Sequence, residues 1–440
     1  MSVLADIAAF VADADVSSLS EADQRLADRH FSDTLVALAA GSLIPEGRSL
    51  LPLADSASFA ERIGLISATA RLTEIDDIHI GSCVTPGAVT VPVALGLVGM
   101  GRDRPASTDV LSAAWAGVEV MTWLGTAIEG PRILSRGVWP TFAVAPLGAA
   151  AVSSRMLGLS TEQTTHALSL ALMLMAGGIG HFKGERSGRW MIFASSVAAG
   201  IRAAMAAQEG YTGDVSLLDG DWLSRSHGID MRKIPFRQDG CAYRRLSMKP
   251  YCSAKQSISA IEAFGMLLDK VGSAEEIVGV VAEVPSIFSE MVSRPSIAGS
   301  RSTTLVSLRH QIALRAYARA ALYDIDRSNT DIDPSVLDFA SRVEIRGNTA
   351  LLDDLPHSWG ARVTVALRHG GEETLSVSQV LGDPDHSLDE ELLLDKWRRV
   401  FLQVGAREHG EAVIAAVRGV RNIGAYRDSL LQLCAPQINL

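Results

Sequence analysis

The densest group of polar residues in an apolar part of the sequence is the segment from Glu74 to His79, which reads Glu-Ile-Asp-Asp-Ile-His. Its carboxylates, on Glu74, Asp76 and Asp77, are close enough to the His79 imidazole for these groups to shift one another's pKa values and supply a general base. A structural alternative is also open, in which the segment is a solvated helix end whose acids cap the next element.

A second group of polar residues lies in the glycine-rich segment from Gly177 to Trp190, which carries His181, Lys183, Arg186 and Arg189. A flexible backbone with these side chains can close over a carboxylate-rich substrate, because Arg binds carboxylates in a bidentate manner and Lys offers a point charge. The glycine spacing does not match G-x-G-x-x-G and no strand is predicted before it, which disfavours a dinucleotide loop. The alternative is an exposed mobile loop.

A third group is Lys249-Pro-Tyr251-Cys-Ser-Ala-Lys255, which precedes a predicted helix. Its two amines and its phenol can act as acid or base once burial brings their pKa values toward the operating pH. The alternative is an ordinary basic turn. His310, next to Arg309 in a later helical pattern, is interpreted as part of a surface pair.

The histidines and cysteines do not favour a metal site or a covalent mechanism. No two histidines have helical ligand spacing with an acid between them, and Cys83, Cys241, Cys252 and Cys434 form no C-x-x-C motif. Neither a G-x-S-x-G elbow nor a Walker loop occurs. The sequence therefore predicts acid/base chemistry without a cofactor or metal, and reduced thiols.

Composition limits the fold to a large and mostly helical one. The 440 residues indicate two or three units, or one core with an insertion, and 48% hydrophobic residues exclude disorder as the main state. The aromatic fraction is only 5%, and Ala, Leu, Gly and Val dominate long stretches, which favours close-packed helices.

Charge and hydropathy limit the partners. The formal net charge is −10 and the Arg residues are scattered, so nucleic acid is not an expected partner. The first residues lack a basic region before their apolar residues, which predicts a cytoplasmic protein without a secretory signal. The apolar runs 143–152 and 167–179 are shorter than the ~20 residues that span a bilayer, so no membrane partner is expected.

Helical spacing of apolar residues covers most of the first half of the chain. It predicts an amphipathic helix between Leu19 and Ala40, with Ser20 and Glu21 as its start signal. It also predicts helices over residues 59–72, 88–100, 107–128, 141–157, 161–176 and 191–208. The start near Thr161 is well marked, because a Ser or Thr cap is followed by Glu162 and Gln163.

After about residue 270 the pattern changes to β-branched, partly alternating segments. Residues 277–284, 341–346 and 362–368 are predicted strands, and Gly370-Gly371 leads into 373–378 as a hairpin. Residues 308–323 have helical spacing between the first two strands. Two more helices are predicted at 388–404, after a Ser387 cap, and at 411–417. The pattern indicates a small α+β unit that interrupts a helical protein.

Short motifs follow one another across residues 76–384, and none is specific alone. They are Asp76-Asp77-x-His79, Pro86-Gly87-Ala88-Val89 with Pro92, Gly137-x-x-Pro140-Thr141, Gly148-Ala-Ala-Ala151, Leu157-Gly-Leu, Lys249-Pro-Tyr251 and Gly382-Asp-Pro384. In their order and spacing they resemble the MmgE/PrpD family, which includes 2-methylcitrate dehydratase, cis-aconitate decarboxylase and iminodisuccinate epimerase.

This resemblance implies a mostly α fold with a large all-α helical domain and an inserted, smaller α+β lid domain. We expect the helical domain at residues 1–268 plus 388–440 and the lid at 269–387. The resemblance also implies a site in the cleft between the two domains and commonly a homodimer.

The resemblance carries over residue by residue, with departures. The family's D-x-D-D-T motif falls on Glu74, Asp76, Asp77 and Ile78, so the threonine is lost. His79 follows, as in many relatives.

Three family histidines are missing. Thr85 stands before Pro-Gly, Trp139 stands in the Gly-x-His-Pro segment, and the histidine after Lys-Pro-Tyr is replaced near Ile258. Arg189 stands where a lysine is usual. Trp139 indicates a less polar pocket wall and hence a substrate other than methylcitrate or cis-aconitate.

The resemblance assigns roles to the candidate residues. Asp77 or His79 is the expected base, and Lys249, Tyr251 or Lys255 the expected acid. The substrate-binding candidates are Glu74, Asp76, Thr85, Trp139, Lys183, Arg186 and Arg189. The predicted activity is removal of a proton α to a carboxylate of a small polycarboxylate, as in a dehydratase-like lyase. The alternatives are an epimerase or isomerase of an amino- or hydroxy-polycarboxylate, and a catalytically inactive carboxylate-binding homologue.

Overall fold

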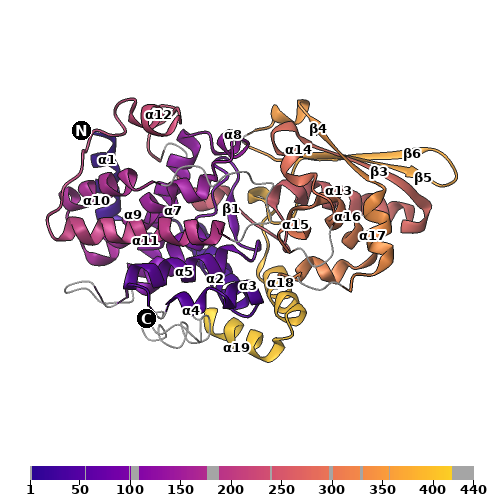
Figure 1. Ribbon diagram of the computed structural model, residues 1–440, viewed down its shortest axis with the longest axis horizontal. Coiled ribbons are helices and arrows are strands. Elements are labelled where there is room, and N and C mark those ends of the chain that lie inside the picture. Colours follow the sequence, from indigo (N-terminus) through magenta and orange to yellow (C-terminus); the bar gives the residue numbers. More distant parts are fainter. Residues whose placement is uncertain are drawn as a thin grey trace. The chain divides into compact units, whose positions relative to one another are not determined.

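The chain is mostly helical and divides into two compact units (Figure 1). A computed structural model describes residues 2–54, 56–98, 100, 109–175, 188–237, 240–296, 301–327, 331–355 and 357–418. Within these residues the first unit, here called the helical unit, spans 2–246 and 408–418, and the mixed unit spans 247–407. The predicted α+β segment 269–387 lies inside the mixed unit. The domain boundaries at 268/269 and 387/388 stay a prediction.

The helical unit contains the helices that the apolar spacing predicts. Its helices are α1 (Val3–Asp13), α2 (Glu21–Gly41), α3 (Pro45–Arg48), α4 (Leu51–Ala54), α5 (Phe59–Arg71), α6 (Gly87–Gly96), α7 (Asp109–Ala127), α8 (Gly130–Leu134), α9 (Pro140–Leu157), α10 (Thr161–Met173), α11 (Arg189–Gln208), α12 (Trp222–His227) and α19 (Arg407–Val417). Strand β1 is Asp77–His79, and β2 (Leu246–Met248) lies where the chain passes into the mixed unit. The predicted start at Thr161 is confirmed, with a capping box between Ser160 and Gln163.

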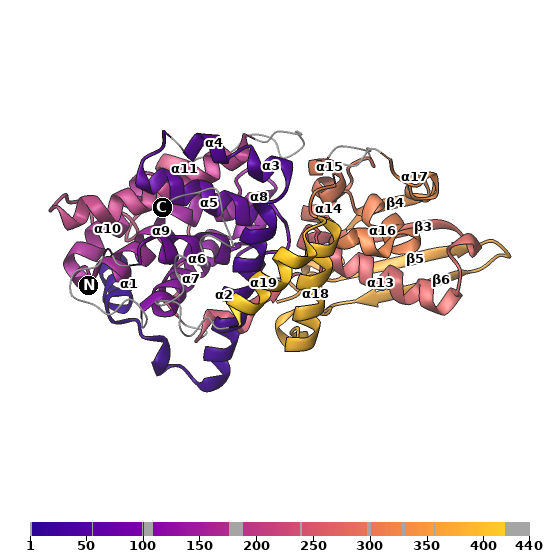
Figure 2. The ribbon, with the colours of Figure 1, turned by 90° about the horizontal axis from the view of Figure 1, so that it is seen from below.

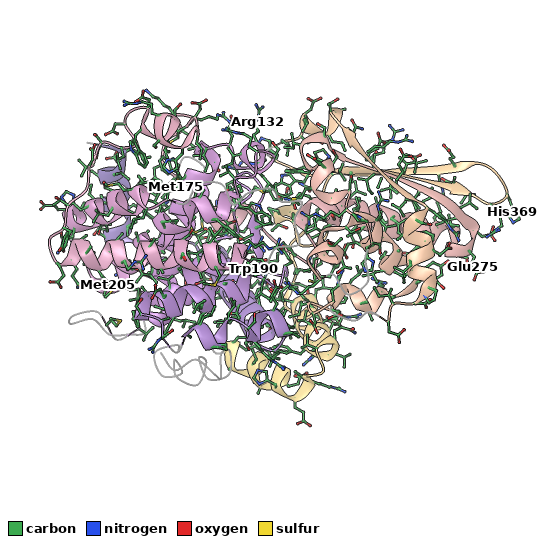
Figure 3. All side chains as sticks on the ribbon, viewed as in Figure 1. Arg132, Met175, Trp190, Met205, Glu275 and His369 are labelled. Atoms are coloured by element: carbon green, nitrogen blue, oxygen red, sulfur yellow. The ribbon has the colours of Figure 1, made fainter. Side chains whose placement is uncertain are left out.

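Small residues let the core helices approach closely, which explains the Ala- and Gly-rich composition. A Cβ on Gly64 of α5 would lie 2.2 Å from the Ala194 carbonyl oxygen of α11, and one on Gly200 of α11 would lie 2.1 Å from the Pro146 oxygen of α9. Helices α5, α9 and α11 are neighbours in both views (Figures 1 and 2). Trp190, at the start of α11, is one of the largest fully buried side chains (Figure 3).

Helix α11 is also the one described helix that is long and apolar enough to cross a membrane. However, 67% of its apolar stretch is buried inside the protein, as in the core helix of a folded unit.

The mixed unit is built on a four-stranded sheet. Its elements are α13 (Lys255–Val271), β3 (Ile277–Pro285), α14 (Ser286–Val292), α15 (Arg301–Val306), α16 (Leu308–Tyr317), α17 (Pro334–Ser341), β4 (Val343–Asn348), β5 (Ala361–Leu367), β6 (Glu372–Val377) and α18 (Glu390–Gln403). The strand order is β4-β3-β5-β6, with β3 parallel to β4 and antiparallel to β5. The predicted hairpin is confirmed: β5 pairs with β6, and Gly370 and Gly371 both have positive φ at the turn.

One face of this sheet is covered by helices. Val280 pairs with Val343 and Val365, and all three side chains are buried, while their neighbours along the strands are more exposed. Helices α13 and α16 lie against the covered face (Figure 1). Helices α14 to α17 form the crossover that the parallel β3–β4 pair requires. His369 lies at the outer end of the β5–β6 hairpin (Figure 3).

Two local expectations are corrected by the structure. The cap of α18 is Asp389, whose side chain accepts from the Leu392 N–H, rather than Ser387. His310 is not part of a surface pair: it is buried, and its Nδ1 lies 2.7 Å from Ser296 Oγ. Periodicity places His310 in a helix, but it does not show which tertiary surface covers this residue.

Candidate functional site

The acidic segment before β1 is buried rather than solvated. The Arg71 guanidinium at the end of α5 lies 3.0 Å from Glu74 Oε1 and 3.4 Å from Asp76 Oδ1. Burial alone lowers the pKa of Arg71, but the two carboxylates outweigh that effect and hold it above its usual value. Glu74 and Asp76 therefore form a buried ion cluster with Arg71 in this structure.

Asp77 joins β1 to the start of α6. Its Oδ1 accepts a hydrogen bond of 3.1 Å from the Gly87 N–H, and its Oδ2 lies 3.4 Å from His30 Nδ1. The side chain is only 1% exposed. A Cβ on Gly87 would lie 2.4 Å from Thr34 Oγ1 and 2.9 Å from Asp77 Oδ2, so only glycine permits this approach. The capping alternative for the acidic segment thus holds for Asp77.

His79 lies at the end of β1 and is held by Ser82. The Ser82 backbone N–H donates to His79 Nδ1 over 3.1 Å, and Ser82 Oγ lies 2.8 Å from the same nitrogen. Burial, with a smaller effect from the Arg245 charge, lowers the pKa of His79 to about 3. The imidazole is therefore neutral at physiological pH.

The starts of α6 and α9 meet at two threonines. The Thr85 N–H donates to Thr141 Oγ1 over 3.1 Å, and the two hydroxyl oxygens lie 3.2 Å apart. Both residues are buried. Thr85 precedes the α6 cap Pro86, and Thr141 is the second residue of α9. Hydroxyl groups thus lie at the position where the resemblance expects a histidine.

The starts of α9 and α11 meet at an aromatic and cationic contact. Trp139, the N-cap residue of α9, lies 5.6 Å from the Arg189 guanidinium, measured to the ring centroid. Arg189 also lies 4.4 Å from the ring of Trp190, whose Nε1 donates to Glu46 over 2.7 Å. The Trp139 ring packs on Phe142 at 5.5 Å. The sequence predicts a less polar wall at Trp139 and a carboxylate-binding role for Arg189, and the structure brings these two side chains into contact.

These helix starts differ from others in the same unit. The caps Ser2, Ser20, Ser58 and Ser160 begin α1, α2, α5 and α10 with a side-chain hydrogen bond. Within the described residues, α9 and α11 begin without a side-chain cap, as do α3, α6, α8 and α12, and the buried Trp139 Nε1 has no hydrogen-bond acceptor. Uncapped helix N-termini carry partial positive charge and offer N–H donors to an anion. Together with Arg189, they are suited to a carboxylate group.

In the mixed unit, two lysines from the third sequence group are buried. Lys255 begins α13, is 2% exposed, and its Nζ donates to Asp383 Oδ1. Burial lowers the pKa of Lys255, although the Asp383 carboxylate acts in the opposite direction. Lys249 is buried too, and its charge contributes to lowering the pKa of Lys255. The alternative of an ordinary basic turn is therefore wrong for these residues.

Asp383 reaches Lys255 because the chain at Gly382 folds closely against β2. The Met248 N–H donates to the Gly382 oxygen over 2.8 Å, and a Cβ on Gly382 would lie 2.0 Å from the Met248 oxygen. The φ angle of Gly382 is +93°, which only glycine adopts easily. The Asp383 carboxylate also accepts from Ser247 Oγ over 3.0 Å and from the Val380 N–H over 2.9 Å.

Tyr251 is buried as well, but its hydroxyl group already has a partner. It donates to Glu262 Oε1 over 2.8 Å. Burial, followed by the Glu262 charge and this hydrogen bond, raises the pKa of Tyr251 well above its ordinary value. This makes it a weaker acid than an exposed tyrosine.

Some residues named in the sequence analysis lie outside the part of the chain that the structure describes. His181, Lys183, Arg186 and Cys434 lie outside the described residues. Cys83, Cys241 and Cys252 are buried. In the described part of the chain, no group of three or more His, Cys, Asp or Glu side chains is arranged to hold a metal ion.

Within the helical unit, contacts link Asp77, Thr85, Trp139 and Arg189 through the starts of α6, α9 and α11. Within the mixed unit, contacts link Lys255 to Asp383. Five neighbours of these residues were not singled out as site residues: His30, Ser82, Thr141, Glu262 and Asp383. Of these five, only Thr141 and Asp383 could have been found from the sequence, because each lies in one of the short motifs that resemble the family.

Two sequence models of one protein family match the chain. The MmgE/PrpD N-terminal domain matches residues 64–227, and the MmgE/PrpD C-terminal domain matches residues 251–421. These matches cover most of the chain, which therefore belongs to the MmgE/PrpD family.

A curated relative extends the comparison. The chain is similar to the cis-aconitate decarboxylase-like protein oryM of Aspergillus oryzae (strain ATCC 42149 / RIB 40), with 29% identity over 163 residues. The matched stretch covers 36% of this chain and 33% of that protein, so the chain spans about a third of this relative's length.

Proposed function

We propose that this protein is a cofactor-independent enzyme that removes a proton α to a carboxylate of a small polycarboxylate, as a dehydratase-like lyase. Membership of a family with dehydratases and decarboxylases supports an enzyme of the lyase kind. The name of the fungal relative refers to a carboxylate with several acid groups, which supports the same substrate class.

The observation that carries the proposal is the donor group at the start of α9 and α11. A buried indole N–H without an acceptor among the described residues lies beside the Arg189 guanidinium and two helix N-termini. An unsatisfied buried donor costs about 1–3 kcal/mol, so such a group favours a ligand that brings an acceptor. A carboxylate is the acceptor that also suits Arg189 and the helix ends.

Proton transfer has candidate groups in both units. Asp77 and His79 are the candidates for removal of the α proton, and Lys249 and Lys255 are the candidates for proton delivery. The lowered pKa of Lys255 supports this role, because an amine with a lowered pKa gives up its proton more readily near neutral pH. Tyr251 is less suited, since its pKa is raised and its hydroxyl donates to Glu262.

The hydrogen bond from Tyr251 to Glu262 favours epimerisation as the second candidate reaction. Elimination of water needs an acid that protonates the departing hydroxyl, whereas inversion at the α carbon needs only proton removal and return. If Tyr251 stays committed to Glu262, the site has one acid fewer for elimination. An amino- or hydroxy-polycarboxylate would then be the substrate.

A binding screen followed by isotope exchange tests these proposals. Thermal shifts with di- and tricarboxylates select ligands, because a ligand at 100 times its Kd adds about 2.7 kcal/mol of stability. Each ligand is then incubated with the enzyme in deuterated water. A new C=C absorbance supports the lyase, and label in a recovered substrate of inverted configuration supports the epimerase. Binding without exchange or product would overturn the enzyme proposal in favour of a carboxylate-binding homologue.

A further inference from the structure

The turn after β1 clamps the backbone of His79. The His79 N–H donates to the Val84 oxygen over 2.7 Å, and the Cys83 N–H donates to the His79 oxygen over 2.9 Å. Cys83 has a φ of +56°, which is a left-handed conformation that is uncommon for a residue other than glycine. This strained and buried turn brings Ser82 back onto the imidazole ring.

The contact with Ser82 fixes the proton on the ring. A backbone N–H can only donate, so His79 Nδ1, which receives the Ser82 N–H, acts as acceptor and carries no proton. In a neutral imidazole the proton then resides on Nε2. A doubly protonated ring would place one N–H against another. Both hydrogen bonds of the ring within the described residues involve Nδ1, which leaves Nε2–H for a ligand.

The surroundings oppose the charged form as well. The side chain is buried, and the charge that acts on it is the Arg245 guanidinium, which disfavours a second positive charge. Both effects lower the pKa of His79, in agreement with the acceptor role of Nδ1. A neutral imidazole whose acceptor nitrogen is occupied can donate a hydrogen bond but cannot take up a proton from a substrate.

We propose that His79 is a fixed hydrogen-bond donor, which presents Nε2–H to an oxygen of the anionic ligand, and that the backbone N–H of Ser82 sets its tautomer. The identity of the ligand as a carboxylate rests on the proposed function. A donor of this kind stabilises negative charge that develops on the substrate oxygen when the α proton leaves. Of the two base candidates, Asp77 then remains for proton removal.

Nitrogen NMR of the unliganded protein, labelled with ¹⁵N-histidine, tests the proton position directly. The difference spectrum between the wild type and His79→Gln isolates the His79 signals. We expect an unprotonated Nδ1 and a protonated Nε2 that do not titrate between about pH 5.5 and 8. A proton on Nδ1, or titration in this range, would overturn the inference. This measurement needs no ligand, so it decides the matter even if the proposed function fails.

Two substitutions test the use of the donor. The Gln amide reaches the position of Nε2 and can still donate, whereas the shorter Asn amide reaches only the position of Nδ1. We expect His79→Asn to bind the best polycarboxylate from the screen at least about tenfold more weakly than His79→Gln, provided that both keep native circular dichroism. Equal affinities of the two variants would contradict a donor role. Ser82→Ala keeps the backbone N–H, so its His79 tautomer should not change.

Discussion

The candidate acid and base residues of the two units are buried in different surroundings. In the helical unit, Asp77 accepts from a backbone N–H and lies beside His30. His79 is neutral because it is buried, and its Nδ1 accepts from the Ser82 N–H. In the mixed unit, two formal charges are buried together, Lys255 with Asp383.

The two surroundings differ in how strongly each site depends on a single side chain. A buried ion pair whose partner is removed leaves an uncompensated charge, whereas a group held by backbone donors keeps its partner after most substitutions. The site around Lys255 should therefore be the more sensitive to the loss of one charge, and the site around Asp77 to the loss of space.

The largest expected effect is on the buried pair. Asp383→Asn removes the carboxylate that faces Lys255 and should lower the free energy of unfolding of the mixed unit by about 3–5 kcal/mol, measured in urea. The matched control is the exposed pair of Lys270 and Glu373, where Lys270→Ala should cost at most about 1 kcal/mol. Equal costs for the two variants would remove the contrast between buried and exposed charge.

The next effect is a pH dependence of the free energy of unfolding, which we expect in both units. His79 and His310 both have a pKa of about 3 in the folded protein, against 6.5 for an ordinary histidine. The unfolded chain binds the extra proton first, so stability is complete above pH 6.5 and falls as the pH decreases toward 3. Each histidine should contribute about 1.4 kcal/mol per pH unit, or about 2 kcal/mol at pH 5.

Urea titrations at pH 7.5, 6 and 5 check this effect. His79→Gln should flatten the pH dependence of the helical unit, and His310→Gln should flatten that of the mixed unit. If neither variant changes the slope, the two histidines are not neutral in the folded protein.

The third effect concerns space at the start of α6. Gly87→Ala places a methyl group against Thr34 and Asp77 and should cost about 1–3 kcal/mol of unfolding free energy in the helical unit. Among the residues that the structure describes, none has an atom within 4 Å of a Cβ on Gly188, before α11, so Gly188→Ala should be nearly neutral. A neutral Gly87→Ala would show that Asp77 does not sit tightly on this helix start.

The smallest effect distinguishes capped from uncapped helices within the helical unit. Ser160→Ala removes the capping box of α10. It should lower the melting temperature of the helical unit by an amount that corresponds to a loss of about 1 kcal/mol in the free energy of unfolding. Carboxylate affinity should not change, because α10 is not one of the two helices assigned to the ligand. A change in affinity would mean that the donor group at α9 and α11 is not the binding feature.

Local signals in the sequence predict most of the helices and strands that carry the candidate residues. The helix from Thr161 is predictable because Ser160 and Gln163 lie at cap spacing, and the β5–β6 hairpin is predictable from two glycines between β-branched segments. Helix α1 is not among the helices predicted from apolar spacing, which begin at Leu19.

The partners in the candidate sites could not be predicted in the same way. Lys255 and Asp383 are 128 residues apart, and His30 of α2 reaches Asp77 of β1. Which side chains meet over such separations depends on how helices and strands pack, and no local spacing records it. The burial of Lys249 and Lys255 was also not visible, because their segment has the composition of a basic turn.

The central claim is that the starts of α9 and α11 hold a carboxylate through Arg189. Calorimetric titration of the best polycarboxylate into the wild type, Arg189→Leu and Arg202→Leu tests it most directly, since Arg202 lies on the same helix but is exposed and faces Glu61. We predict a loss of affinity of at least about tenfold for Arg189→Leu and none for Arg202→Leu. Equal affinities for all three proteins would contradict the account.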